Sequence, residues 1–316
     1  MTPSPAPSVA LHRLATLLAG TTFILIFIGG LVTSTGSGLA VPDWPLSFGQ
    51  FFPPMVGGVF YEHGHRMVAT LVGMLTVALA VAARLTGATL LIQRLTLLAV
   101  ATVITQGVLG GVTVLFLLPT PVSVGHACLA QAFLCLTVAL AVITAPSWQG
   151  MRAPGAEGDP GLRALTAATV ATVYVQLILG AIMRHTGAGL AIPDFPLAFG
   201  GLVPPFDLPG VPVHFLHRMG ALAVTVMVMA SLASVRARSG EDRRLTRPAR
   251  LAAVLVLFQV TLGALTIWTG KAVLPTTTHV VCGAAVLAAT FVLALRTWRI
   301  TAATPQDAPT FVEVLA

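Results

Sequence analysis

Charged residues are scarce in this sequence. Only 9% of its 316 residues are Asp, Glu, Lys or Arg, whereas a soluble domain usually has about 25%. Hydrophobic residues make up 56% of the chain, and the mean hydropathy is +0.92. A water-soluble globule of this length could not cover its surface with so few charges, and a disordered chain is far more polar. The composition excludes both classes and predicts a polytopic membrane protein.

Cysteine is scarce as well. The chain has three cysteines, and no two of them form a Cys-x-x-Cys pair. Cys128, Cys135 and Cys282 all lie within apolar runs. A thiol in such surroundings is usually a packing residue, so we expect neither a disulfide nor a cysteine-ligated metal.

Long apolar runs make up most of the sequence. A helix needs about 20 apolar residues to cross a bilayer. Eight stretches reach roughly that length: Leu14–Val32, Arg66–Ala83, Leu95–Phe116, Val122–Thr144, Leu162–Met183, Phe215–Val235, Leu251–Thr269 and Thr276–Leu295. They predict an all-α membrane protein with eight transmembrane helices. The first run is too long for a signal peptide and lacks a small-x-small cleavage site, so we expect it to be retained.

The basic residues are distributed unevenly between the ends of these spans. The chain has 17 Lys and Arg against 10 Asp and Glu, a net charge of +7. Four basic residues flank the outer ends of the spans, and the other 13 flank the opposite ends. The four are Arg66, Arg184, Arg218 and Lys271. Because basic loops stay in the cytoplasm, both termini are predicted to be cytoplasmic. The excess charge therefore predicts orientation and contact with lipid headgroups, not nucleic-acid binding.

The sequence contains an internal repeat. Gly36–Leu46 matches Gly187–Leu197, and His65–Met67 matches His217–Met219. Each repeat holds four spans, so both enter the membrane from the same side as a parallel repeat. We expect two four-helix bundles. The predicted divisions are an N-terminal repeat (1–145), a cytoplasmic linker (146–161), a C-terminal repeat (162–300) and a tail (301–316).

Four of the eight histidines are duplicated by the repeat. His65, His126, His217 and His279 each open an even-numbered span at its outer end. Ionisable side chains are costly in a membrane and usually functional there. The first two can face each other across one bundle, and the last two across the other. Two imidazoles do not complete a tetrahedral zinc site, but they suit the axial positions of a haem.

An arginine follows one histidine of each pair. Arg66 and Arg218 could bind the carboxylates of a haem, or they could extend toward lipid headgroups. Two further pairs are duplicated. The loop aspartates Asp43 and Asp194 could stiffen a lid or contact a ligand. The glutamines Gln106 and Gln259 could bond across each bundle or touch a cofactor. No role is predicted for His63, His185 or His214.

The repeat is broken beside His65. Glu62 stands where the second half has His214, and it lies three residues before His65, on the same face of a helix. A carboxylate beside a haem could move a proton or stabilise a cationic intermediate. The alternative is a solvated acid near a helix start, where the helix dipole favours it. The asymmetry predicts a reacting haem in the first half and a resident haem in the second.

Together these residues resemble the haem A synthase family. The similar elements are the loop Gly36–Pro45, Glu62-x-x-His65-Arg66, His126, His217-Arg218 and His279. The resemblance implies oxidation of one methyl group of haem O to a formyl group, giving haem A for terminal oxidases. It implies that His65 and His126 bracket the haem O substrate, that His217 and His279 ligate haem B, and that Glu62 is catalytic.

We expect a bacterial plasma membrane instead of a mitochondrion, because the short amino-terminal segment shows no Arg-rich transit pattern. The partners that the resemblance implies are haem O synthase and the oxidase assembly machinery, besides membrane lipid. The first outer loop departs from many family members, because residues 33–62 contain no cysteine pair. The electron acceptor and the source of oxygen stay open. Two other functions remain: a bis-histidine membrane cytochrome b that carries electrons, and a haem transporter or chaperone. Neither requires Glu62.

Overall fold

The structure is a computed structural model that describes residues 8–151 and 159–301. Within these residues eight helices are long and apolar enough to cross a membrane. They are α1 (Val9–Ser34), α2 (Gly58–Leu85), α3 (Leu90–Leu115), α4 (Thr120–Ile143), α6 (Pro160–His185), α7 (Val211–Ser239), α8 (Arg243–Trp268) and α9 (Val273–Thr301). Two short helices, α5 (Pro146–Gln149) and η1 (Ala188–Leu190), complete the set. The predicted all-α membrane fold is confirmed.

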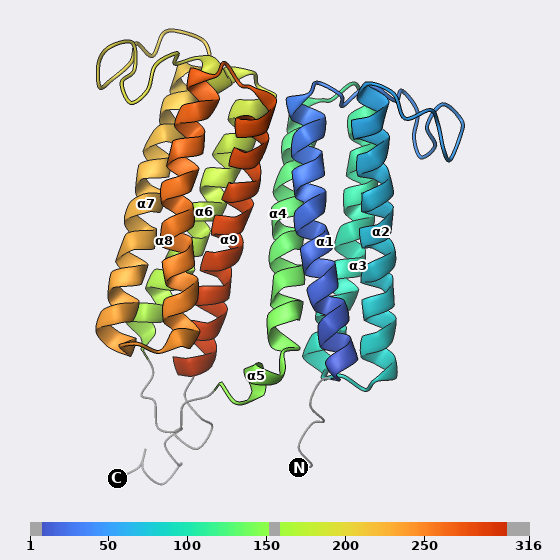
Figure 1. Cartoon of the computed structure of the whole chain (residues 1–316), viewed down its shortest axis with the longest axis vertical. Coiled ribbons are helices and arrows are strands. Elements are labelled where there is room, and N and C mark those ends of the chain that lie inside the picture. The colour runs from blue at the N-terminus through green and yellow to red at the C-terminus, as the bar shows by residue number, and fades with distance from the viewer. Residues whose placement is uncertain (1–7, 152–158, 302–316) are drawn as a thin grey trace, which may run out of the picture.

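The long helices form two bundles that stand side by side (Figure 1). Helices α1–α4 make one bundle, and α6–α9 make the other. The two main hydrophobic clusters lie within the bundles, and large apolar side chains also cover the outer surface of the helices. Helices α1 and α4 of the first bundle contact α6 and α9 of the second. In each bundle the second and fourth helices are diagonal partners, because the first and third lie between them.

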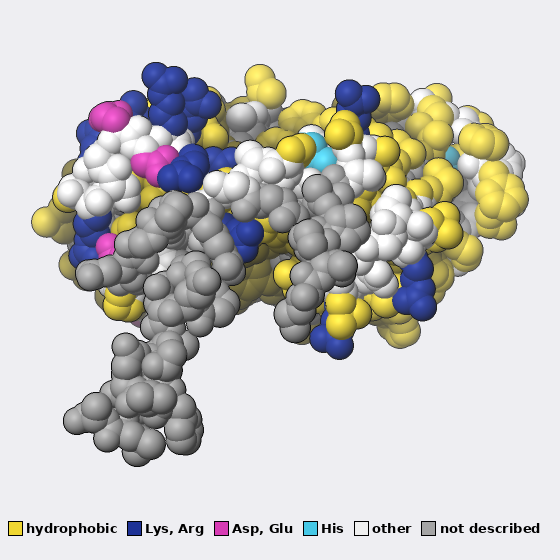
Figure 2. Space-filling model, turned by 90° about the horizontal axis from the view of Figure 1, so that it is seen from below, with side chains coloured by type: hydrophobic (Ala, Val, Ile, Leu, Met, Phe, Trp, Pro, Cys, Tyr) yellow, Lys and Arg dark blue, Asp and Glu magenta, His cyan; other side chains and the backbone are white. Residues whose placement is uncertain are grey.

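The two ends of the molecule differ. Helix α1 begins and helix α9 ends at the same end, and the two long loops leave the opposite end (Figure 1). Seen from the end without long loops, basic side chains are spread around the margin (Figure 2). This arrangement matches an even number of spans per repeat. Which end faces the cytoplasm stays a prediction from the basic residues.

Several helices extend beyond the predicted spans. Helix α2 begins at Gly58 instead of Arg66, and α8 begins at Arg243 instead of Leu251. The predictions followed apolar runs, but hydrogen bonding continues a helix into polar residues past the hydrocarbon layer. Asp242 caps α8 by accepting a hydrogen bond from the Arg244 backbone N–H. Helix α5 lies within the predicted linker, whereas residues 152–158 and the tail after Thr301 lie outside the described residues.

Candidate functional site: two histidine pairs under two loops

The four duplicated histidines lie at one depth. His65 is seven residues into α2, while His126, His217 and His279 are each six residues into α4, α7 and α9. The prediction that they open their helices is therefore wrong by nearly two turns, or about 9 Å along a helix. The longer helices place all four side chains inside the bundles, below the loops.

Each bundle pairs two of these histidines across its diagonal. The imidazole rings of His217 and His279 have centroids 6.4 Å apart, with an angle of 64° between their planes. His65 and His126 lie at nearly the same depth on the diagonal helices α2 and α4. The structure thus brings together the pairs that the repeat predicts.

A glycine on the preceding helix lies against each ring. A Cβ atom added at Gly29 or Gly180 would lie 3.1 Å from the Cε1 of His65 or His217. The same distance is 3.3 Å from Gly263 to His279, and 3.5 Å from Gly110 to His126. These four contacts repeat in both bundles, and sequence reasoning missed them. The spacing could have revealed them, because the glycines are duplicated in step with the histidines.

Glutamines surround the rings as well. Gln106 donates to the backbone carbonyl of His126 at 3.1 Å, and the Gln259 amide lies 3.4 Å from Nε2 of His279. Gln176 lies 3.1 Å from Nδ1 of His217 and donates to its carbonyl at 2.8 Å. The duplicated glutamines therefore hold the histidine helices within a bundle. Gln176 was not predicted, because the first half has Leu25 at that position.

The donor set fits a metal held by two imidazoles inside a larger ligand. Among the described residues no group of three or more His, Cys, Asp or Glu could hold an ion. Imidazole nitrogens bind metals at about 2 Å, and ring centroids 6.4 Å apart leave room for one metal atom between His217 and His279. Nδ1 of His65, His126 and His279 is buried without a hydrogen-bond partner in the described structure.

The surroundings of the second pair fit an apolar cofactor. An open recess of about 320 Å³ lies between α8 and α9, lined by Leu262, Leu265, Leu274, Pro275 and Thr278. Leu262 adjoins Gly263, and Thr278 adjoins His279. Deeper in the bundle, Gln176 and Gln259 line a cavity of only about 30 Å³. The recess therefore lies between the loop-side ends of α8 and α9, and neither His217 nor His279 is among its lining residues.

Glu62 is buried and fully engaged. Only 4% of its surface is exposed. Its Oε2 accepts a hydrogen bond from the Val41 backbone N–H at 2.8 Å, and its Oε1 pairs with Arg66 at 2.7 Å. The alternative of a solvated acid is therefore wrong. His214 takes the same place in the second half, where its Nδ1 accepts from the Ile192 N–H at 3.2 Å.

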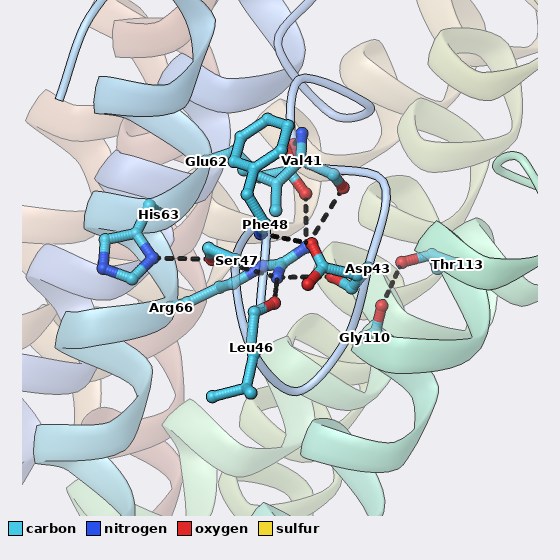
Figure 3. Close-up of polar contacts among 10 residues, drawn as sticks. All are labelled: Val41, Asp43, Leu46, Ser47, Phe48, Glu62, His63, Arg66, Gly110 and Thr113. Atoms are coloured by element: carbon cyan, nitrogen blue, oxygen red, sulfur yellow. Dashed lines mark hydrogen bonds and ion pairs between the residues drawn. The ribbon is translucent and has the colours of Figure 1, made fainter. Parts of the chain in front are cut away.

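Arg66 and Arg218 hold the loops in the same way. Besides pairing with Glu62, Arg66 donates through Nη1 to the carbonyls of Asp43 and Leu46, at 2.8 and 2.9 Å (Figure 3). Arg218 donates to the carbonyls of Asp194 and Leu197, at 2.6 and 2.8 Å. Both guanidinium groups thus face loop backbone. Their predicted contact with a haem carboxylate stays a prediction.

The loop aspartates stabilise a turn. Asp43 accepts hydrogen bonds from the N–H groups of Phe48 and Gly49, and Asp194 accepts them from Phe199 and Gly200. The Gly49 and Phe48 donors hold the pKa of Asp43 below its usual value, and the equivalent donors lower the pKa of Asp194. This geometry supports the lid interpretation of both loops.

The loops cover their bundles with different aromatic contacts. The Trp44 ring lies over α3, where a Cβ added at Gly111 would be 2.7 Å from it. In the second half Phe195 meets Trp268 of α8 edge to face, with centroids 6.2 Å apart. His63, beside Glu62, bonds Ser47 of the first loop at 2.8 Å. Each lid therefore contacts its bundle through an aromatic ring, but the contacting residues differ between the two halves.

Fold and site together define a class: a multi-pass membrane protein with duplicated four-helix bundles, each holding a histidine pair beneath a fixed loop. Comparison with known proteins identifies the family. Residues 55–291 match the model of the COX15-CtaA family, described as cytochrome oxidase assembly protein. The chain belongs to this family.

Its relatives agree. It is 36% identical to a haem A synthase of Symbiobacterium thermophilum, over 79% of this chain and 84% of the relative. It is 30% identical to haem A synthases of Halalkalibacterium halodurans, over 78% and 84% of the two chains, and of Shouchella clausii, over 84% and 89%. The resemblance inferred from the motifs is confirmed.

Proposed function

We propose that this protein is a haem A synthase of a prokaryotic plasma membrane, with both termini cytoplasmic. The substrate is haem O, and the reaction oxidises one of its methyl groups to a formyl group. The observation that carries this proposal is the pair of half-buried histidines in each bundle, with the buried carboxylate of Glu62 beside the first pair and His214 in its place beside the second. The names of the relatives and the family support the same reaction.

The first bundle is the proposed substrate site. His65 and His126 bracket the substrate, with their rings seated against Gly29 and Gly110. Glu62 lies one turn before His65, and Arg66 and Val41 fix both of its oxygens. Written with water as the oxygen source, oxidation of a methyl to a formyl group releases protons, passes its electrons to an external acceptor and develops positive charge on the reacting carbon. The Glu62 carboxylate, held in a site shielded from water, can accept a proton or stabilise that charge.

The second bundle is the proposed cofactor site. His217 and His279 hold haem B, which supplies a one-electron redox centre when bound. His214 replaces the carboxylate there, so the second bundle has no anionic group at that position. Gln176 and Gln259 orient the two histidine helices. The proposed division of roles rests on Glu62 in the first bundle and on His214 and Gln176 in the second.

The substitution Glu62→Gln tests the proposal, because the amide oxygen can still accept the Val41 N–H while the negative charge is lost. We expect haem A formation to fall by about 100-fold or more, the usual range for a catalytic acid or base. The protein should keep its haem B spectrum and accumulate haem O or a partly oxidised intermediate. Pigment extraction from the purified protein, followed by chromatography, measures all three.

The matched control is His214→Gln, which places the same amide at the equivalent position of the second half without removing a negative charge. It should leave haem A output within a few-fold of the wild-type level. Full activity in Glu62→Gln would remove Glu62 from the mechanism. If the wild-type protein holds only haem B in a host that makes haem O, the electron-carrier function is favoured instead.

A further inference from the structure

Arg184 is a cation between the two bundles. It is the penultimate residue of α6, half-buried, and its Nη2 donates to the Gly30 carbonyl at 3.2 Å and to Ser34 Oγ at 2.8 Å, both on α1. Among the residues that the structure describes, Arg184 forms no ion pair. A half-buried cation with only neutral partners is costly in a membrane, and intramembrane arginines normally have an anionic partner.

The position of Arg184 along α6 places it beside the second histidine pair. Gly180, which lies against the His217 ring, is four residues earlier. Residues four apart share a helix face and are separated by about 6 Å along the axis. Arg184 is therefore one turn farther toward the loop end than the His217 ring, on the same side of α6.

Contacts with α9 give the same location. Ser34, which accepts from Arg184, also accepts from the Thr277 hydroxyl at 2.9 Å. Thr277 is two residues before His279 on α9, so Ser34 joins Arg184 to the part of α9 that carries His279. The guanidinium thus lies at the loop side of both histidines.

The first bundle has no such cation. The position equivalent to Arg184 is Thr33, one turn after Gly29, which lies against His65. The Thr33 hydroxyl donates to the carbonyl of Gly29. The two arginines that follow histidines, Arg66 and Arg218, both hold loop carbonyls. Of these three arginines, only Arg184 has neither a carboxylate nor a loop to bind.

We propose that Arg184 is the counter-ion of a carboxylate on the cofactor held by His217 and His279. This proposal rests on the proposed function, because it requires a haem in the second bundle. A haem carries propionate carboxylates, and a guanidinium binds a carboxylate through charge-assisted hydrogen bonds. The carboxylate edge of the cofactor then points toward the loop end, at the junction of the bundles, and the apolar edge points away from it.

The test separates charge from helix packing. Arg184→Gln removes the charge but keeps N–H donors for Gly30 and Ser34, whereas Arg184→Lys keeps the charge. In the purified full chain we expect Arg184→Gln to shift the midpoint potential of the low-spin haem to more negative values, because a nearby positive charge favours the reduced state. Haem B retained per protein after washing should also fall. Arg184→Lys should stay near wild type.

Arg236→Gln is the control. Arg236 is exposed near the end of α7 that lies away from the long loops, and its loss changes the net charge by the same amount. An unchanged potential and haem content in Arg184→Gln would overturn the pairing while leaving the proposed function intact. Equal losses in Arg184→Gln and Arg184→Lys would assign Arg184 to helix packing instead. A wild-type protein without haem B would overturn the proposed cofactor site, and the pairing with it.

Discussion

The two bundles share their histidine positions and loop anchors, but they differ in the side chains next to the histidines. In both, histidines on diagonal helices lie against glycines, and a loop is fixed by an aspartate turn and an arginine. Three positions near the histidine pairs differ between the bundles. Glu62 corresponds to His214, Thr33 to Arg184, and Leu25 to Gln176. The first bundle gains a carboxylate, and the second gains a cation and an amide.

This comparison separates structure from chemistry at Glu62. Glu62 accepts a hydrogen bond from the Val41 N–H of the first loop, and His214 accepts the equivalent bond from the Ile192 N–H of the second. A carboxylate is therefore not required to hold this kind of loop. Burying a charge costs free energy that an imidazole avoids. The presence of a buried Glu62–Arg66 pair is thus better explained by a need for charge than by a need for stability.

The largest expected effect comes from replacing the duplicated histidines, which should affect the two bundles differently. His217→Ala or His279→Ala should abolish the haem B optical signal, because one axial ligand is lost and the other histidine is left alone. His65→Ala and His126→Ala should keep that signal and abolish haem A formation. Optical spectra of the four purified variants provide the measurement. Loss of the haem B signal in His65→Ala, with the signal kept in His217→Ala, would reverse the assignment of the two halves.

An intermediate effect tests the glycine contacts. Gly29→Ala and Gly180→Ala place a methyl group 3.1 Å from a ring carbon, so the ring or the helix has to move. Overpacking of this kind costs about 1–3 kcal/mol. Thermal unfolding of the purified protein, read by circular dichroism, reports the loss. Gly110→Ala is the matched control, because 3.5 Å is an ordinary contact. Equal losses in all three variants would show that ring contact does not set the cost.

The smallest expected effect concerns the loop turns, which should respond alike in both halves. Backbone donors lower the pKa of Asp43 and Asp194 from 3.8. A lowered pKa in the folded loop means that the stabilisation is present above pH 3.8 and is lost as the pH falls through the lowered value. Pepsin cleavage within the loops should therefore begin only in strong acid.

Asp43→Asn should move the onset of cleavage in the first loop to higher pH, and Asp194→Asn should do the same in the second. Each variant serves as the control for the other, because its unchanged loop should keep the wild-type profile. Cleavage of both loops in either variant would show that the turns are coupled instead of independent.

Much of the architecture could be predicted from this sequence because apolar length and duplication are local signals. The eight spans and the histidine duplication needed no knowledge of packing. The start of α2 at Gly58 could not be read this way, since Tyr61, Glu62 and His63 interrupt the apolar run and become helical through contact with the loop. Local hydropathy carries no information about that contact.

The site was predicted less completely, for the same physical reason. The path of the first loop decides that Arg66 binds the carbonyls of Asp43 and Leu46, and a loop path depends on long-range contacts. Arg184 was counted only as an outer-end charge, because its contact with α1 forms between bundles. Comparing the halves position by position would have revealed it, since its equivalent is Thr33.

The parallel repeat has a consequence for how the two bundles could become different. Two identical four-helix chains paired around an axis along the membrane normal would carry the same residue at every equivalent position. Such a homodimer could not have glutamate on one side and histidine on the other. Joining the copies through the connection after α4 removes that constraint. A covalent connection thus lets the two halves carry different residues beside their histidine pairs, as Glu62 and His214 do.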